Sequence, residues 1–259
     1  MALQFRIERF GEVDSTNLGI LHALEAGEPE GLVWRARMQM GGYGRQGRSW
    51  SSPEGGLYQS LLLRPEVPLA QLPTLAPLVA LSAREALLRV SGASSDSILV
   101  KWPNDVVCSA GKLVGISLEM HAGGVCVGIG VNVHRPAEEA PVGGKNTPAY
   151  VEDLGNPTAT VDDVGDEVLA AFGPSYERWQ REGFAAFVDD FRTCDALCGQ
   201  RVELVTLDGS QLACGTATGI DEQGRLLVDD GQTVRPLASG EAHIVASSSK
   251  GEGALCANS

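Results

Sequence analysis

A glycine-rich segment between two strand-forming runs limits the folds open to this chain. The segment covers residues 41–50, and the flanking runs at 32–39 and 57–63 are rich in aliphatic side chains. Residues 42–47 match the pattern G-x-G-x-x-G, but a dinucleotide-binding fold requires a helix directly after these glycines. The residues that follow include Pro53 and two further glycines, which end helices. We therefore predict a loop that joins two strands, and no dinucleotide-binding turn.

The charge of this segment points to an anionic ligand. Residues 31–53 carry four arginines and no acidic residue, although the chain has a formal net charge of −13. Glycines allow backbone N–H groups to approach a ligand, and guanidinium groups bind phosphate or carboxylate in a bidentate manner. The indole of Trp50 can stack on a nucleobase. The segment is therefore predicted to close over an anionic, adenine-bearing ligand; the alternative is a solvated hairpin loop.

Composition argues against several other classes of protein. With 33 acidic and 20 basic residues, the chain has little clustered positive charge outside this segment, so nucleic-acid binding is not expected. It has no signal-peptide core and no apolar run of about 18 residues, so no membrane span is expected. The six cysteines include no C-x-x-C pair, which argues against a zinc site and a disulfide framework. We expect a cytoplasmic protein without a metal site built from side chains.

Periodicity predicts alternating strands and helices up to about residue 197. Two adjacent predicted strands carry large side chains on one face and small side chains on the other. The small face of the first strand contains Gly115 and Ser117, and that of the second contains Gly128 and Gly130. Glycines inside strands mark a close approach, so an aromatic side chain or a flat ligand should fill the slot above them. Strands are expected at 5–10, 32–39, 57–63, 98–102, 112–120 and 125–133, helices at 18–24, 75–90, 161–172 and 184–196 with a break at Gly173-Pro174, and a short ordered piece at 150–154 in a loop at 135–160.

The last part of the chain has a different sequence pattern, with short strand-like runs and frequent turn signals. Short strand-like runs at 202–207, 211–218, 226–228, 233–237 and 242–245 are separated by dipeptides such as Asp208-Gly209 and Asp230-Gly231, which are hairpin turn signals. This pattern predicts a small closed β-barrel. We expect a first domain at 1–197, the barrel at 198–246 and a disordered tail at 247–259.

Four sequence blocks, in order, make the chain resemble the biotin protein ligases. They are Ser15-Thr16-Asn17; Gln39 with the loop 42–50; Lys101-Trp102-Pro103-Asn104-Asp105; and residues 112–116 with 128–132. The resemblance implies an α+β fold in which helices cover a mixed sheet, as in class II synthetases, followed by an SH3-like barrel. It also implies a form without the N-terminal DNA-binding domain that some members carry, and leaves open whether the protein is a homodimer.

The family resemblance implies a two-step reaction with ATP, biotin and Mg²⁺. Biotin is activated as biotinyl-AMP and is then transferred to a lysine of a biotin carboxyl carrier protein domain. The resemblance assigns Lys112, Arg45 and Asp105 as catalytic. The residues that it assigns to ligand binding are Ser15, Thr16, Asn17 and Gln39 at the ureido ring, Gly42, Tyr43 and Gly44 along the loop backbone, Arg45, Arg48 and Lys112 at the carboxylate and phosphate, Trp50 and Asn132 around the adenine, and Gly115.

Elementary electrostatics agrees with this implication. A carboxylate that attacks a phosphate brings two anions together, so the site must supply cations, for which Lys112, the loop arginines and Mg²⁺ are the candidates. Asp105 could orient the acceptor amine, help to hold Mg²⁺ or be structural, and these alternatives stay open. Tyr43 stands where the family usually has arginine, which lowers the charge over the pyrophosphate. The rival hypotheses are a lipoate or octanoate ligase of related fold and a non-catalytic biotin or nucleotide sensor.

Overall fold

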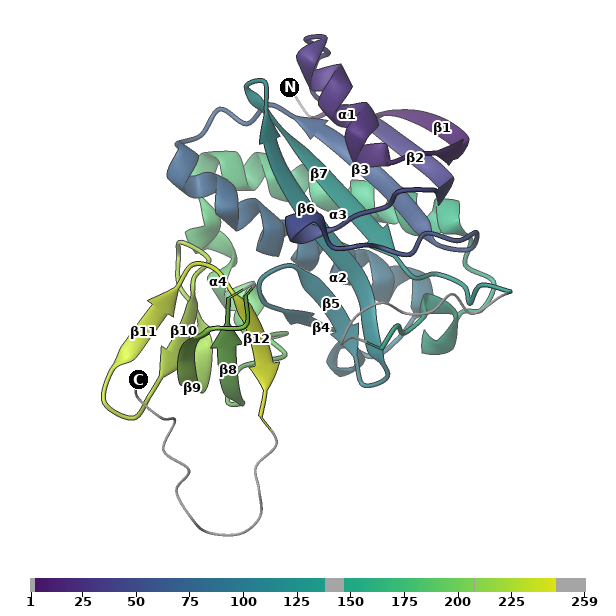
Figure 1. Ribbon diagram of the computed structural model, residues 1–259. Coiled ribbons are helices and arrows are strands. Elements are labelled where there is room, and N and C mark those ends of the chain that lie inside the picture. The colour runs from purple at the N-terminus through teal and green to yellow at the C-terminus, as the bar shows by residue number, and fades with distance from the viewer. Residues whose placement is uncertain (1–2, 138–146, 207, 246–259) are drawn as a thin grey trace.

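The computed structural model describes residues 3–137, 147–206 and 208–245, which form a large mixed sheet with helices and a small antiparallel sheet (Figure 1). The expected α+β fold is confirmed. The large sheet has the strand order β1-β2-β3-β7-β6-β5-β4, in which β1 and β2 are parallel and the other neighbours are antiparallel. Its strands are β1 (Arg6–Val13), β2 (Leu32–Gln39), β3 (Leu57–Leu63), β4 (Leu99–Lys101), β5 (Asp105–Cys108), β6 (Gly111–His121) and β7 (Gly124–Val131).

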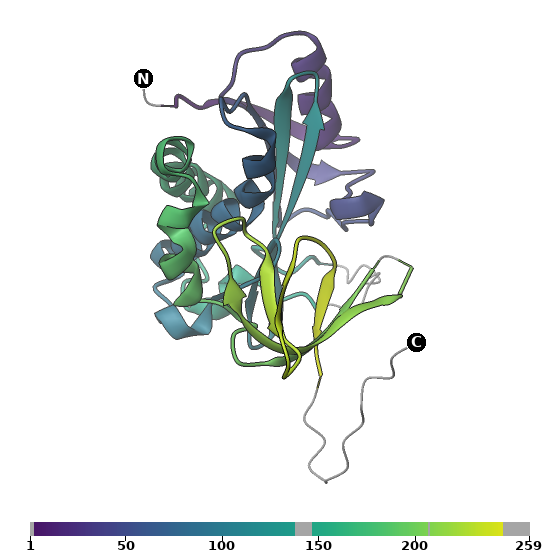
Figure 2. The same ribbon diagram turned by 90° about the vertical axis from the view of Figure 1, so that its left-hand side faces the viewer.

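Helices lie on both faces of the large sheet. α1 (Thr16–Glu25) packs on one face, while α2 (Leu75–Ser91) and α3 (Val161–Glu182) lie side by side on the other, as two perpendicular views show (Figures 1 and 2). The apolar face predicted for α2 is buried in the core. The short ordered piece expected near residue 150 is confirmed as a 3₁₀ turn, Val151–Leu154. Within the described ranges, no helix combines the length and apolar character needed to cross a bilayer.

The break predicted at Gly173-Pro174 is wrong, because α3 runs through it to Glu182. Phe172, Tyr176 and Trp179 are all fully buried, so one continuous apolar face packs on both sides of the proline. This packing outweighs the roughly 3 kcal/mol that a proline costs inside a helix. The helix ends instead at Gly183, where φ is +72°. The helix expected at 184–196 is shorter than predicted, a 3₁₀ turn at Phe184–Phe187 followed by α4 (Val188–Arg192).

Five antiparallel strands form the small sheet, in the order β11-β10-β9-β8-β12, which is consistent with the expected SH3-like barrel. Trp102 ties this sheet to the large one, because its Nε1 donates to the carbonyl of Gly224 over 2.9 Å. The division at residue 197 remains a prediction, and the tail predicted at 247–259 lies outside the described residues. The strands are β8 (Arg201–Val205), β9 (Gln211–Ile220), β10 (Leu226–Asp229), β11 (Val234–Leu237) and β12 (Glu241–Ile244).

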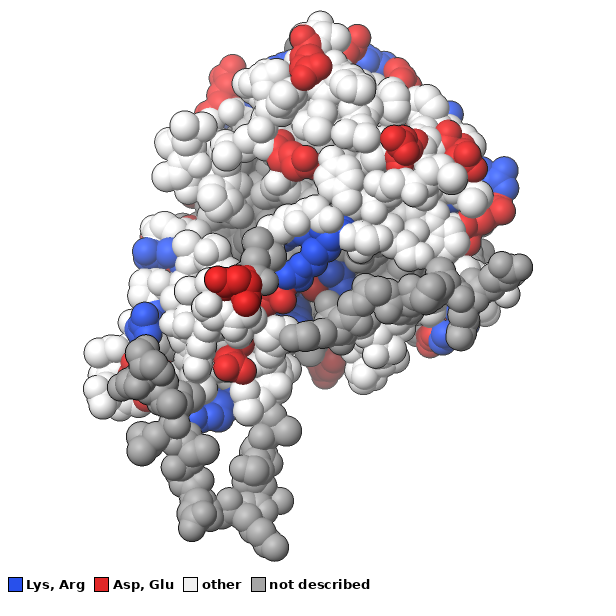
Figure 3. Space-filling model, viewed as in Figure 1, with Lys and Arg blue, Asp and Glu red and all other residues white. Residues whose placement is uncertain are grey.

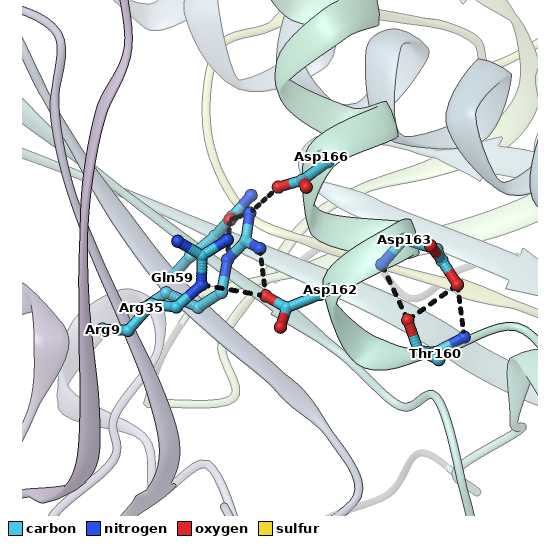
Figure 4. A network of polar contacts seen from close by, with 7 residues as sticks. All are labelled: Arg9, Arg35, Gln59, Thr160, Asp162, Asp163 and Asp166. Carbon is cyan, nitrogen blue, oxygen red and sulfur yellow. Dashed lines mark hydrogen bonds and ion pairs between the residues drawn. The ribbon is translucent and has the colours of Figure 1, made fainter.

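A buried arginine joins β2 to α3 (Figure 4). Arg35 is 4% exposed, and its guanidinium donates to Gln59 and forms ion pairs with Asp162 at 2.5 Å and Asp166 at 2.9 Å. A Cβ on Gly165 would lie 2.5 Å from the guanidinium, so this glycine leaves room for it to cross the helix. The hydrogen bond from Arg35 lowers the pKa of Asp162 below its usual value. This network fixes the helix layer against the sheet on the face away from α1.

Candidate active site

A cavity of about 900 Å³ lies between the large sheet, the glycine-rich loop and β12 of the small sheet. It brings together parts of the chain that are far apart in sequence, because the loop joins β2 to β3 and folds over β6 and β7. The predicted site residues that line it are Thr16, Asn17, Gln39, Tyr43, Gly44, Arg45, Arg48, Trp50, Asp105, Lys112, Gly115 and Asn132.

Two predicted site residues do not line this cavity. Ser15 occupies the N-cap position of α1, is 4% exposed, and makes no capping hydrogen bond through its side chain. Gly42 closes the base of the loop, where its carbonyl accepts from the Trp50 amide over 2.9 Å. A Cβ on Gly42 would lie 2.4 Å from the hydroxyl of Ser52. Both residues support the walls of the cavity from outside.

The floor of the cavity is a row of directly paired residues across five strands. Lys101 pairs with Asp105, Asp105 with Gly115, Gly115 with Gly130, and Gly130 with Tyr58. Cross-strand partners point to the same face of a sheet, so the two glycines leave a flat slot between polar ends.

The side chain of Trp50 fills this slot. A Cβ on either Gly115 or Gly130 would lie 2.7 Å from the indole. Of the two occupants that the sequence allowed, the structure contains the aromatic side chain. The ammonium of Lys112 lies 5.3 Å from the centre of the ring, within the range of a cation–π interaction. The loop tryptophan and the cavity lysine therefore form one packed unit.

A β-bulge places Lys112 in the cavity. In the pairing of β5 with β6, Val106 faces Val114 but Val107 faces Lys112, so the register skips Leu113. Strict alternation would put Lys112 on the face opposite to Gly115, and the extra residue returns it to the cavity side. Its Nζ lies 2.7 Å from Oδ1 of Asp105.

Asn132 holds the backbone at Lys112 in place. Its Nδ2 donates to the carbonyl of Lys112 over 2.9 Å, and the Ala149 amide donates to the same carbonyl. The Lys112 amide in turn donates to the carbonyl of Thr147 over 2.8 Å. Asn132 was predicted at the adenine, and in this structure its side chain orients the lysine.

Positive charge exceeds negative charge around Asp105. Burial lowers the pKa of Arg45 and of Lys101, and the charge of Asp105 opposes both shifts. Arg45 Nη1 donates to Oδ1 of Asn104 over 2.9 Å, which fastens the loop to the turn before β5. In the space-filling view, Lys and Arg side chains gather in a hollow at the centre of this face, while most Asp and Glu side chains are spread over the surrounding surface (Figure 3). The hollow is therefore suited to an anion.

Arg48 differs from Arg45, because its guanidinium is ion-paired with Glu241 of β12. The pair links the glycine-rich loop to the small sheet across the mouth of the cavity. The sequence predicted Arg48 at the carboxylate and phosphate, whereas here a carboxylate of the protein already neutralises it.

Beside the cations, hydroxyl and amide groups form a neutral polar network. The Thr16 amide donates to Oε1 of Gln39 over 2.9 Å, and the Thr16 hydroxyl shares a hydrogen bond with Ser60, whose hydroxyl donates to Asn17 over 2.6 Å. Asn17 donates to Glu119 over 2.9 Å. Such a set of donors and acceptors fits an uncharged polar ring more closely than a phosphate.

Tyr43 joins this network from the loop. Its hydroxyl donates to Glu119 over 3.3 Å, and burial, reinforced by the charge of Glu119, raises the pKa of Tyr43. The residue is thus a neutral donor at the position where the family usually has arginine. Four residues that also line the cavity were not predicted as site residues: Lys101, Asn104, Ser117 and Glu241. Ser60 and Glu119, in the polar network, were not predicted either. The available signals were the polar residues on the small strand faces and the 101–105 block that carried the resemblance.

Comparisons with known proteins agree with this geometry. Residues 11–134 match the biotin/lipoate A/B protein ligase family, and residues 197–243 match the biotin protein ligase C terminal domain. The chain is 33% identical to a biotin--[acetyl-CoA-carboxylase] ligase of Paracoccus denitrificans, over 87% of this chain and 95% of that one. It is 30% identical to the enzyme of that name from Mycobacterium tuberculosis, over 92% and 89% of the two chains. The structure of the biotin protein ligase from Aquifex aeolicus in complex with biotin and ATP superimposes with a TM-score of 0.79 and 28% identity, covering 93% of this chain and 99% of that one.

Proposed function

The chain belongs to the biotin/lipoate A/B protein ligase family, and from this premise we propose that it activates biotin as biotinyl-AMP and transfers the biotinyl group to a lysine of a carboxylase. The main support is that Arg45 and Lys112 line one cavity, beside a neutral polar network and above a slot that holds an indole. Cations suit the two reacting anions, the network suits a ureido ring, and the indole in the slot suits stacking with an adenine.

In the first step, a carboxylate oxygen of biotin attacks the α-phosphorus of ATP. A new O–P bond forms, and pyrophosphate leaves with the electrons of the bond that breaks. Lys112 and Arg45 reduce the repulsion between the two anions and stabilise the charge of the transition state. The loop, fastened through Asn104 and Glu241, limits the access of water to the mixed anhydride.

In the second step, the neutral amine of the acceptor lysine attacks the carbonyl carbon of biotinyl-AMP. An amide bond forms, the carbon–oxygen bond to the phosphate breaks as AMP leaves with its electrons, and the nitrogen loses one proton to solvent. Lys112 stays next to the leaving phosphate, while Asp105 holds the ammonium of Lys112 in position. We propose that Asp105 also orients the acceptor amine. The test is to give an Asp105→Asn variant preformed biotinyl-AMP and to measure transfer to the acceptor.

Mg²⁺ is proposed to enter with ATP. Among the described residues, no group of three or more His, Cys, Asp or Glu side chains is arranged to hold a metal ion. Mg²⁺ commonly binds one or two carboxylates together with substrate phosphates. Asp105, on the cavity floor, would be the protein ligand in the first step, where the ion would neutralise phosphate charge; its role toward the acceptor amine belongs to the second step.

The acceptor and the compartment are further parts of this proposal. The acceptor would be a biotin carboxyl carrier protein domain, since the relatives are named for a carboxylase that carries biotin. A cytoplasmic location is supported by the thiols of Cys108, Cys126, Cys194 and Cys198, which form no disulfide in the structure. A homodimer is an additional hypothesis, which sedimentation velocity tests.

Biotin is favoured over lipoate by the small C-terminal sheet. The family match to the catalytic region covers both kinds of ligase, whereas the match at residues 197–243 is to the biotin protein ligases. The test is to incubate the protein with ATP, Mg²⁺ and labelled pyrophosphate, together with biotin or lipoate. We expect label to enter ATP with biotin alone. Exchange with lipoate alone would favour the rival ligase, and no exchange with either acid would contradict the proposed function.

A further inference from the structure

Lys101 is a cavity cation that has no carboxylate at close range among the residues that the structure describes. It ends β4, is half-buried and lines the cavity. Its cross-strand partner is Asp105, but the carboxylate of Asp105 is ion-paired with Lys112 instead. Among the described residues, no carboxylate lies within ion-pairing distance of Lys101, and no hydrogen bond engages its ammonium.

Such a side chain is costly unless a ligand compensates it. Burial lowers the pKa of Lys101, the charge of Asp105 opposes this shift without cancelling it, and the charge of Lys112 adds to it. Most lysines avoid the cost by extending into solvent. A cation that is instead held facing a cavity is a mark of a site built for an anion.

The row on the cavity floor indicates which part of the ligand Lys101 would meet. Gly115 and Gly130, under Trp50, form the middle of the row, and Lys101 stands at its end beyond Asp105. Strands are spaced by about 4.8 Å, so Lys101 lies roughly 10 Å from Gly115 along the row. Lys112 projects toward the indole in the slot, where the proposed function puts the attack on the α-phosphate. Lys101 is therefore placed for the far end of a triphosphate.

We propose that Lys101 is a further catalytic residue, which binds the β- and γ-phosphates of ATP and the pyrophosphate that leaves. This inference rests on the proposed function. The two lysines on either side of Asp105 then have different roles. Lys112 would contact the α-phosphate in both steps, whereas Lys101 would act only in the step that involves pyrophosphate.

The two half-reactions separate this role from a structural one. The first measurement is pyrophosphorolysis, in which synthetic biotinyl-AMP and pyrophosphate give ATP and biotin. The second is transfer from the same biotinyl-AMP to a carrier domain without pyrophosphate. For Lys101→Met, we expect the KM for pyrophosphate to rise about 10- to 100-fold, because this is the loss of affinity expected when one hydrogen bond to a charged group is removed. We expect transfer to stay within about two-fold of wild type, and Lys101→Arg to recover part of the pyrophosphate affinity.

Arg192→Met is the matched control, because it removes a cation of exposed α4 that pairs with Asp189 away from the cavity. It should leave both half-reactions unchanged. The melting temperature of Lys101→Met should equal or exceed that of wild type, since the substitution removes a desolvated charge.

Two results would overturn the assignment of Lys101 alone: an unchanged KM for pyrophosphate in Lys101→Met, or equal losses in both half-reactions. A wild-type protein that catalyses neither half-reaction would overturn the proposed function, and this inference with it.

Discussion

The ammonium of Lys112 lies 2.7 Å from a carboxylate oxygen of Asp105, although strict alternation along β6 would place the two side chains on opposite faces of the sheet. The bulge at Leu113 brings them together, and Asn132 fixes the backbone at the bulge. A lysine held by both its carbonyl and its ammonium is pre-organised, and pre-organised charge is what lowers the barrier to joining two anions.

Arg45→Gly is predicted to weaken retention of biotinyl-AMP. Arg45 supplies cavity charge and fastens the loop to Asn104, so its loss should release the adenylate, which then labels lysines of bystander proteins. Labelling of serum albumin in the reaction measures the escape. Asn104→Ala keeps the charge of Arg45 but removes the hydrogen bond that Arg45 donates to Asn104, so it should increase labelling less than Arg45→Gly. An unchanged lifetime of the bound intermediate in Arg45→Gly would contradict this role.

The ion pair of Arg48 with Glu241 is predicted to hold the loop against the small sheet before ligands bind. Glu241→Gln should increase the rate of tryptic cleavage after Arg45 by up to about five-fold, because a partly exposed pair contributes up to about 1 kcal/mol. In the Arg48→Gln background, Glu241→Gln should have no further effect. Equal increases in both backgrounds would show that Glu241 acts without Arg48.

Gly130→Ala is predicted to displace Trp50. The new methyl group would lie 2.7 Å from the indole, so the ring must leave the slot. If the indole stacks on adenine, the KM for ATP should rise about 5- to 100-fold, since a stacked base contributes about 1–3 kcal/mol. Gly11→Ala in β1 is the control, because among the described residues, its chain neighbours aside, no heavy atom lies within 4 Å of the added Cβ. Equal KM values for both variants would remove Trp50 from the nucleotide site.

The ion pair of Asp162 with Arg35 is predicted to make stability depend on pH. The hydrogen bond from Arg35 lowers the pKa of Asp162 in the folded state, so the contribution is complete above the unfolded pKa of about 4 and is lost as pH falls through the folded pKa. Asp162→Asn should therefore lower the free energy of unfolding at pH 7 by less than about 1 kcal/mol, because the carboxylate is more than half exposed. In urea titrations the difference from wild type should shrink below pH 4. A difference that is constant from pH 7 to pH 2.5 would contradict the assignment.

Local patterns were sufficient for much of the fold. The buried face of α2 and the glycine faces of β6 and β7 follow from spacing along one element, and the prediction of a slot needed only that Gly115 and Gly130 be neighbours. Their pairing in register confirms it. The loop between β2 and β3 was likewise predictable, because the proline and glycines after Trp50 exclude a helix.

The features that sequence did not predict depend on contacts between distant elements. A bulge at Leu113 is a property of the pairing of β5 with β6, so the alternation of β6 alone does not show it. The continuation of α3 through Pro174 depends on core packing on both sides of the proline. The pair of Arg48 with Glu241 joins residues that are far apart in the chain, and neither residue type in its local context indicates the other.

The most direct test of the central claim is the rate of biotin-dependent exchange of labelled pyrophosphate into ATP, compared between wild type and Lys112→Ala. The cavity charge that joins carboxylate to phosphate depends on this lysine, so we predict that exchange falls by about 10²- to 10³-fold. Arg192→Met, which removes a surface cation, should exchange at the wild-type rate. A folded Lys112→Ala variant that exchanges pyrophosphate at nearly the normal rate would contradict the account.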